Sequence, residues 1–232
     1  MPIIAKLLWL LLFCSLTVSA DEEAKVTGEP SAELKQLSPD YKEGEDYRVL
    51  KTPEKHDATA IQIVVAEVFW YGCPHCYTLE GIASSWEQTL PKDVKFIRVP
   101  AFFGPNIWKN HANLYYTIQN MGIVDKVHYG IFDEIQNKKN YLENSGKMSA
   151  FLKSKFKVDK NKFLKTYKSL KVTHQLMEAS TRTRAYGITG VPALVVGGQY
   201  IVEPGLAQSL EKMTDITDYL IAKIRRDRDK KT

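Results

Sequence analysis

The sequence predicts an α/β fold that carries an inserted all-helical domain. Three observations predict this class: residues 61–99 follow a strand–helix–strand pattern, residues 105–171 space their apolar side chains as helices do, and strand-like runs return after residue 192. The composition agrees, because 44% hydrophobic and 25% charged residues are ordinary for a globular chain. A fibrous protein and a wholly disordered one are thereby excluded.

The strand–helix–strand pattern begins with an apolar run over residues 61–70. Both alternating faces of this run are apolar, which is typical of a strand covered on both sides, and Glu67 interrupts it. A helix is predicted over residues 74–90, directly after Cys73, and a second strand over residues 94–99. Cys73 therefore lies at the carboxyl end of the first strand, where open α/β sheets carry their functional groups.

The other elements follow from periodicity and turn residues. Residues 105–171 are too long for a simple crossover and are predicted as the inserted helical domain, with Ser145 and Asn161 as candidate helix caps. We then expect a helix, a hairpin and a final amphipathic helix, at residues 173–186, 193–202 and 209–224. The rest of the fold is assigned to residues 46–104, which start with an edge strand, and to residues 172–232.

The first twenty residues have the features of a secretory signal peptide. Lys6 precedes an apolar run at residues 7–13, and Val18-Ser19-Ala20 resembles a signal peptidase site. The apolar run is short for an uncleaved membrane anchor, and the bulky Phe13 argues against lipidation at Cys14. We expect cleavage after Ala20, followed by a flexible polar lead at residues 21–45 in which a short helix would allow homodimerisation.

Charge and cysteine count narrow the function classes. The net charge of +5, from 32 Lys and Arg against 27 Asp and Glu, is too small and too dispersed to indicate a nucleic-acid partner. The basic residues at 223–231 are interpreted as a solvated helix end, with attraction to a membrane surface as the alternative. Three cysteines exclude a multi-disulfide scaffold and a pair of four-cysteine zinc sites.

The motif Cys73-Pro74-His75-Cys76 holds both cysteines that remain after the predicted cleavage. At the start of a helix the two thiols lie on one side of the first turn and can form a small disulfide ring. The helix dipole and free N–H groups favour a thiolate at Cys73, which makes it the nucleophile, and Cys76 the resolving thiol. Pro74 fits the first turn without losing a hydrogen bond, and His75 favours the thiolate further.

Stabilising this thiolate stabilises the dithiol form and makes the disulfide an oxidant of other proteins. The cysteine pair also admits two other interpretations. It could be half of a zinc site completed by two of the histidines His56, His111, His128 and His174. No second ligand pair at zinc spacing is present, however. It could also be a structural disulfide, although a minimal loop gains little stability from closure. Export to an oxidising compartment favours redox catalysis.

Glu67 is an acid in the middle of an apolar strand, six residues before Cys73. A buried carboxyl must be either protonated or paired. Glu67 could move the proton of Cys76 during exchange, or it could form an ion pair with Arg98 of the next strand. The role of Glu80, four residues after Cys76, stays open between a functional and a structural interpretation.

Two segments carry a resemblance to a known family: residues 69–77, Phe-Trp-Tyr-Gly-Cys-Pro-His-Cys-Tyr, and residues 190–193, Gly-Val-Pro-Ala. Together they resemble the DsbA family of periplasmic thiol:disulfide oxidoreductases, over nearly the whole chain from about residue 41. The resemblance implies a thioredoxin fold with a helical insertion. It also implies that Cys73 attacks, Cys76 resolves, His75 tunes Cys73, and Val191 with a cis Pro192 lies against the disulfide and binds unfolded substrate.

The resemblance further implies that Glu67 and Glu80 are buried acids and that Arg98 stands where a relative has Lys. The predicted function is thiol:disulfide interchange, in which the Cys73–Cys76 disulfide oxidises cysteine pairs of newly exported proteins. No metal and no cofactor beyond that disulfide is expected. The implied partners are unfolded exported proteins with free thiols and a DsbB-like, quinone-linked membrane protein, and the implied location is the periplasm.

Two departures from the family pattern keep alternatives open. Trp70-Tyr71-Gly72 replaces a Phe-rich segment before the first cysteine, which changes the substrate groove. The polar lead is longer than in compact members, and dimerisation through it would favour an isomerase. The alternatives are therefore an isomerase or reductase of the same fold, and a non-catalytic export chaperone or metal-binding module.

Overall fold

A computed structural model describes residues 40–53, 62–104 and 106–230 of the chain. The predicted signal peptide at 1–20 and all but the last six residues of the predicted lead at 21–45 lie outside the described residues. The described residues all belong to one compact unit, so the boundaries expected within it stay a prediction. None of the described helices is long and apolar enough to cross a membrane.

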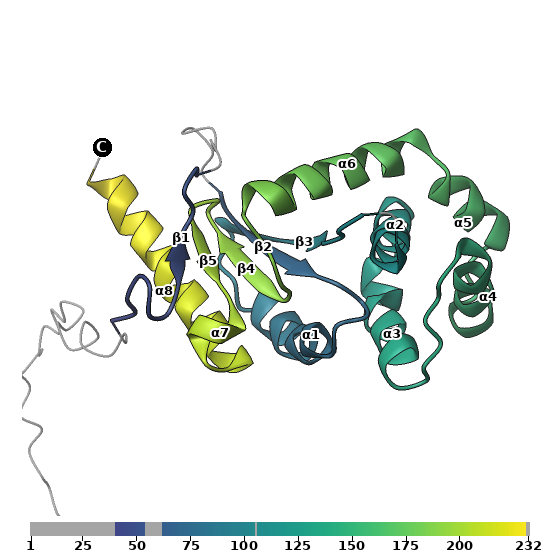
Figure 1. Ribbon diagram of the computed structural model, residues 1–232, viewed down its shortest axis with the longest axis horizontal. Helices are drawn as coiled ribbons and strands as arrows, with labels where there is room; N and C mark the ends of the chain where they lie inside the picture. Colours follow the sequence, from purple (N-terminus) through teal and green to yellow (C-terminus); the bar gives the residue numbers. More distant parts are fainter. Residues whose placement is uncertain (1–39, 54–61, 105, 231–232) are drawn as a thin grey trace, which may run out of the picture. The chain divides into compact units, whose positions relative to one another are not determined.

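The described sheet has five strands in the order β1-β5-β4-β2-β3. The strands are β1 (Arg48–Val49), β2 (Ile63–Phe69), β3 (Val94–Pro100), β4 (Ala193–Val196) and β5 (Tyr200–Val202). Strand β2 is parallel to β3 and antiparallel to β4, while β4–β5 and β5–β1 are antiparallel. Parallel neighbours require a crossover, which α1 (Pro74–Glu87) supplies between β2 and β3 (Figure 1).

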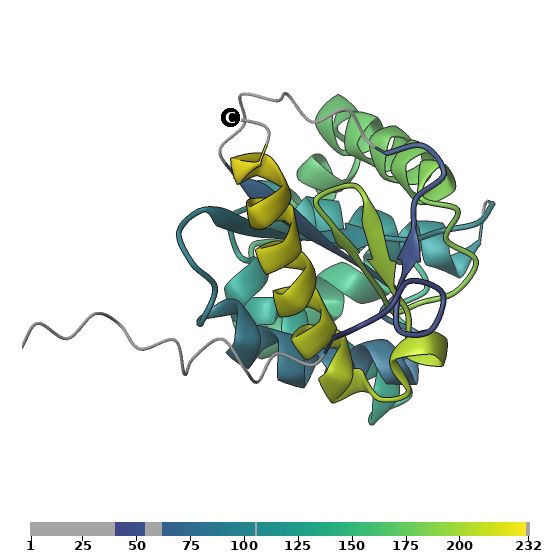
Figure 2. The ribbon, with the colours of Figure 1, turned by 90° about the vertical axis from the view of Figure 1, so that its left-hand side faces the viewer.

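Both faces of β2 are buried, as its two apolar faces predict. Ile63 and Val65 pack against α1 and α8 (Leu210–Asp229), which lies across one face of the sheet (Figure 2). Ala66 and Val68 belong to the second cluster of buried side chains, which the helical insertion shares. A short helix, α7 (Pro204–Ala207), precedes α8. Helix α8 ends five residues later than predicted, and Arg226 and Arg228 in its last turn complement the helix dipole.

Five helices lie between β3 and β4: α2 (Ile107–Asn120), α3 (Val124–Gln136), α4 (Ser145–Phe156), α5 (Lys160–Tyr167) and α6 (Leu170–Ala185). Figure 1 shows α2 to α5 grouped at the carboxyl ends of β2 and β3, with α6 leading back to the sheet. The predicted caps Ser145 and Asn161 are wrong by one and two residues. Asn144 and Asp159 have the extended backbone of a cap, and their side chains accept the N–H of Lys147 and Lys162.

Candidate active site

The two cysteines lie at the start of α1. Cys73 is the N-cap residue and Pro74 occupies the first turn, where no N–H is required. The N–H of Cys73 donates to the carbonyl of Trp70 over 3.0 Å. Both cysteines are free thiols; Cys73 is half-buried and Cys76 is buried, whereas Pro74 and His75 are exposed. A reactant from solution therefore reaches Cys73 and not Cys76.

The environment separates the two thiols chemically. The pKa of Cys73 is lowered to about 6, chiefly because the Cys76 side chain hydrogen-bonds to its sulfur; the N–H groups of Cys76 and His75 and the His75 charge add to this against a smaller effect of burial. Burial raises the pKa of the Cys76 thiol well above its usual value. At neutral pH the accessible sulfur is the thiolate and the buried one keeps its proton.

The Val191-Pro192 peptide bond is cis, which confirms the expectation from the family resemblance. Val68 of β2 pairs with Ala193 of β4, so the segment before β4 and the segment after β2 meet at one edge of the sheet. Cys73 Sγ lies 3.4 Å from the carbonyl oxygen of Val191, across 118 positions of sequence, and donates a hydrogen bond to it only while the thiol is protonated. Val191 is half-buried, and its backbone lies beside the reactive sulfur.

Behind the cysteines lies a buried cluster of acids around one cation. Glu67 is fully buried, and neither of its carboxylate oxygens has a hydrogen-bond partner among the described residues. Arg98 Nε lies 3.5 Å from Glu67 Oε2, so the two side chains of the expected ion pair are neighbours but are not hydrogen-bonded. Burial, followed by the charge of Glu80, raises the pKa of Glu67 to about 8. The carboxyl of Glu67 is therefore neutral at pH 7.

Glu80 receives the hydrogen bonds that Glu67 lacks. Arg98 donates from Nη2 to Oε1 over 2.9 Å and from Nε to Oε2 over 3.1 Å, and the Ser84 hydroxyl donates to Oε1 over 2.7 Å. Arg98 Nη1 also lies 3.1 Å from Glu87 Oε2. Burial alone would raise the pKa of Glu80, but its hydrogen bond and electrostatic interaction with His128, followed by the charge and hydrogen bonds of Arg98, lower it to about 2. Glu80, not Glu67, is thus the ionised partner of Arg98.

Sequence reasoning did not place His128 and its hydrogen-bond partner Tyr71 in this cluster. His128 of α3 is almost fully buried, with Nε2 at 3.2 Å from Glu80 Oε2 and Nδ1 at 2.6 Å from the Tyr71 hydroxyl. The sequence marked His128 only as a candidate zinc ligand. Helical spacing places it on the buried face of α3 with Val127 and Ile131, and that burial was the available signal that it needed polar partners.

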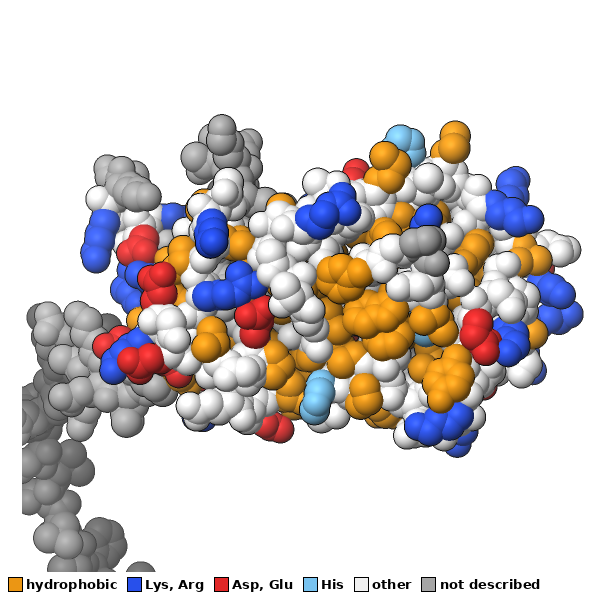
Figure 3. All heavy atoms as spheres, viewed as in Figure 1, with side chains coloured by type: hydrophobic (Ala, Val, Ile, Leu, Met, Phe, Trp, Pro, Cys, Tyr) orange, Lys and Arg blue, Asp and Glu red, His pale blue; other side chains and the backbone are white. Residues whose placement is uncertain are grey.

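Aromatic side chains surround residues 70–73, the cysteine loop that joins β2 to α1. The Trp70 ring stacks on Trp108 of α2 with centroids 4.0 Å apart, and Phe103 packs edge-on against Trp108. A Cβ at Gly72 would lie 2.2 Å from Trp70 Cζ2, so the ring can fold over this position only because it is glycine. Apolar side chains gather where the loop after β2 meets α2 and α3 (Figure 3). This surface can receive apolar side chains of a polypeptide next to Cys73.

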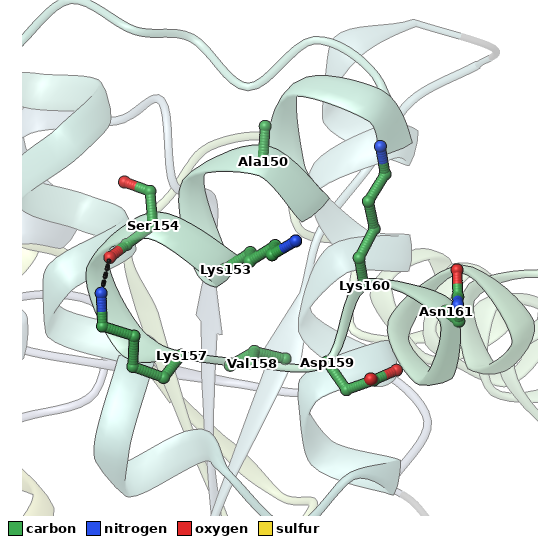
Figure 4. Close-up of a pocket in the computed structure, with 8 residues that line it drawn as sticks. All are labelled: Ala150, Lys153, Ser154, Lys157, Val158, Asp159, Lys160 and Asn161. Carbon is green, nitrogen blue, oxygen red and sulfur yellow. Dashed lines mark hydrogen bonds between the residues drawn. The ribbon is translucent and has the colours of Figure 1, made fainter.

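A hollow of about 770 Å³ at the α4–α5 turn contains none of the predicted site residues. Its lysines are exposed; Lys157 donates to the Ser154 carbonyl, and Asp159 occupies the N-cap of α5 (Figure 4). Within the described ranges no three His, Cys, Asp or Glu side chains are grouped as metal ligands. Of the histidines considered for zinc, His111 bonds to the Tyr141 carbonyl through Nε2, and His56 lies outside the described residues.

A cysteine pair at the amino end of the first sheet-connecting helix, with a cis-proline segment against the nucleophile, defines a thiol:disulfide oxidoreductase of the thioredoxin fold. Residues 64–216 match the DSBA-like thioredoxin domain family. The chain belongs to the DsbA family, which confirms the sequence resemblance and the predicted fold class with its helical insertion.

The similarity to individual members is extensive. The chain is 40% identical over 186 residues to the thiol:disulfide interchange protein DsbA of Pseudomonas aeruginosa, covering 80% of this chain and 87% of that one. It is 42% identical over 186 residues to DsbA of Azotobacter vinelandii, covering 80% and 86%. The crystal structure of Pseudomonas aeruginosa DsbA superimposes with a TM-score of 0.76 at 40% identity over 81% and 96% of the two chains. That of Xylella fastidiosa DsbA gives 0.73 at 27% identity over 80% and 98%.

Proposed function

We propose that this protein oxidises cysteine pairs of newly exported proteins by transferring its Cys73–Cys76 disulfide to them. The observation that carries the proposal is the asymmetry of the two thiols, since the accessible sulfur of Cys73 has a pKa of about 6 and the buried Cys76 has a raised one. A stabilised Cys73 thiolate favours the dithiol form of the enzyme. After allowance for solvent around the half-buried sulfur, this contributes at most about 1 kcal/mol at pH 7, or ~20 mV towards an oxidising potential.

The reaction follows from the positions of the two sulfurs. A substrate thiolate attacks Cys73 Sγ, the Cys73–Cys76 bond breaks, and Cys76 leaves with the electron pair and takes up a proton. A second substrate thiolate then attacks the substrate sulfur of the mixed disulfide and releases Cys73 as a thiolate. The substrate has lost two electrons and the enzyme has gained them. Glu67, which lies near enough to Cys76 for its ionisation to affect that thiol, is the proposed proton donor to the leaving Cys76.

The remaining predicted residues have roles in binding and tuning. The Val191 carbonyl, beside Cys73, offers a backbone acceptor to an extended substrate segment, and Pro192 holds that segment of the loop. His75 stabilises the Cys73 thiolate through its backbone N–H and its charge. Pro74 occupies the first turn of α1, where no N–H is required. Relatives carry the name thiol:disulfide interchange protein. From the family resemblance and the expected signal peptide we assign this chain to the periplasm, with unfolded thiol-bearing proteins as substrates and a DsbB-like, quinone-linked membrane protein as its oxidant.

The test is the redox equilibrium of the protein in glutathione buffers. Trp70 lies in the cysteine loop, so its fluorescence is a direct reporter of the dithiol and disulfide states. A potential well above that of glutathione supports the oxidase. A potential as low as that of thioredoxin would instead assign a reductase or isomerase.

Two variants separate the remaining alternatives. Cys73→Ala must abolish oxidation of a reduced, unfolded client protein. In Cys76→Ala the Cys73 thiolate can still attack the disulfide of an oxidised client, and it must retain that client as a mixed disulfide because the resolving thiol is missing. A chaperone would protect the client equally well without either thiol. Zinc bound stoichiometrically by the reduced protein would support the metal-site alternative.

A further inference from the structure

We propose that His128 is a positioning residue for the redox centre: as a neutral imidazole it holds Glu80 through Nε2 and Tyr71 through Nδ1, so that Arg98 stays paired with Glu80 and Glu67 keeps its proton. This deepens the proposed function, because that proton is the one assigned to the leaving Cys76. No charged substrate group reaches His128, which is 4% exposed. It acts through its neighbours.

The hydrogen bonds determine the tautomer of His128. Glu80 is already an acceptor for Arg98 and Ser84, so as a carboxylate it can only accept from His128 Nε2–H over 3.2 Å. A neutral imidazole with its proton on Nε2 offers Nδ1 as an acceptor. The Tyr71 hydroxyl, 2.6 Å away, therefore donates to it. Burial also lowers the pKa of His128, which agrees with a neutral ring.

Arg98 cannot serve both acids equally. Its Nε and Nη2 form a two-pronged contact with Glu80, and its Nη1 lies against Glu87, so Glu67 is left with a 3.5 Å approach and no hydrogen bond. The orientation of Glu80 therefore decides which acid is ionised. If Glu80 rotates away or becomes protonated, Arg98 is free to close on Glu67, and Glu67 loses its proton. His128 and Ser84 hold that orientation.

The same histidine ties the cysteine loop to the helical insertion. Tyr71 stands two residues before Cys73, and α3 bonds to it twice: through His128 to the hydroxyl, and through Gln136 Nε2, which donates to the Tyr71 carbonyl over 2.8 Å. Helices α1 and α3 pack against each other, as Figure 1 also shows. A side chain of the insertion thus links the loop, the first helix and, through Glu80, the cation on β3.

The ionisable groups that surround this network come from every neighbouring element. Glu80, Glu87 and Cys76 come from α1, Arg98 from β3, Tyr115 from α2 and Tyr71 from the loop after β2. Glu67 loses its proton at neutral to slightly alkaline pH, whereas the raised pKa of Cys76 keeps the buried thiol protonated to higher pH. Infrared spectroscopy of the protonated carboxyl isolates Glu67, because a thiol contributes no carbonyl band.

The test measures the pH midpoint at which the carbonyl band of protonated Glu67 disappears in the reduced protein. Glu67→Gln identifies the band by removing it. His128→Leu removes both hydrogen bonds and should lower the midpoint by about one pH unit, a tenfold change in the acid dissociation constant. His128→Gln keeps an N–H donor for Glu80 and should leave the midpoint near the wild-type value. Phe163→Leu, in the buried core of α5 away from the network, controls for general loosening.

An unchanged midpoint in His128→Leu, or an equal shift in His128→Gln, overturns the proposal. If His128→Leu does not fold, Tyr71→Phe replaces it, because loss of the hydroxyl leaves Nδ1 unpaired and weakens the Nε2 contact. A smaller shift in the same direction supports the proposal, and no shift overturns it. The rate of disulfide exchange should shift along the pH axis in parallel. The glutathione equilibrium tests the oxidase separately, so a failure of one is distinguishable from a failure of the other.

Discussion

Replacing Glu67 by leucine should change how the stability of the protein depends on pH. Glu67 is fully buried on β2, and burial together with Glu80 raises its carboxyl pKa from 4.5 to about 8. Between these two values the unfolded chain has released the proton and the folded protein retains it. Folding therefore takes up a proton, and the stability that Glu67 contributes falls as pH rises through this window.

The size of the effect follows from the same two values. Between pH 5 and pH 8 the wild-type protein should lose stability, relative to a variant without the acid, of the order of 3 kcal/mol. The substituted leucine side chain has no proton to exchange, and the other titrating groups are common to both proteins. The constant part of the substitution, such as altered packing, cancels because only the change with pH is compared.

The assay is urea unfolding of the reduced protein and of Glu67→Leu at several pH values across that range. The stability difference between the two should widen in favour of the variant as pH increases. Val65→Ala, on the same strand, serves as the control and should give a curve parallel to wild type. Parallel curves for Glu67→Leu and wild type would falsify a neutral, proton-loaded Glu67.

Three further outcomes are expected. Alkylation at pH 7 should modify Cys73 rapidly, because a pKa of about 6 leaves about nine-tenths of it as thiolate, and spare Cys76; equal labelling by mass spectrometry contradicts this. Arg98→Met should lower the free energy of unfolding by about 3–5 kcal/mol, since it strands the buried Glu80 carboxylate; a loss below about 1 kcal/mol in urea is the contrary result. Gly72→Ala should displace the Trp70 ring from Trp108, destabilise the protein by about 1–3 kcal/mol and alter tryptophan fluorescence; an unchanged spectrum would show that the ring has another position.

Much of the site could be predicted from the sequence because its chemistry is local. Cys73, Pro74, His75 and Cys76 follow one another at a strand–helix junction, which places the first thiol at the helix start and the second one turn further along. The strand pattern also predicted correctly that β2 is covered on both faces, since the residues of both its alternating faces are apolar apart from Glu67. Glu67 was recognised as unusual for the same reason.

The partners of the acids could not be predicted, because they come from separate elements. Glu80 and Arg98 are 18 positions apart, and Glu80 and His128 are 48 apart. From the sequence, Arg98 was considered as an ion-pair partner of Glu67, whereas in the structure Arg98 donates its hydrogen bonds to Glu80. Only the orientation of α1 against β3 decides that, since both carboxyls are within reach of one guanidinium. The helix caps were misplaced for a simpler reason: adjacent polar residues compete for one capping position.

The sequence by itself determined the reactive chemistry of this protein: a thiol pair at a helix start, an acid within an apolar strand, and a helical segment between two parts of a sheet. These depend on spacing along the chain, which folding preserves. The tertiary structure decided which acid is charged, which side chain orients it and which carbonyl lies beside Cys73. Those outcomes depend on contacts of about 3 Å between polar atoms that β2, β3, α1, α3 and the segment before β4 bring together, where burial removes the water that would otherwise satisfy every polar group.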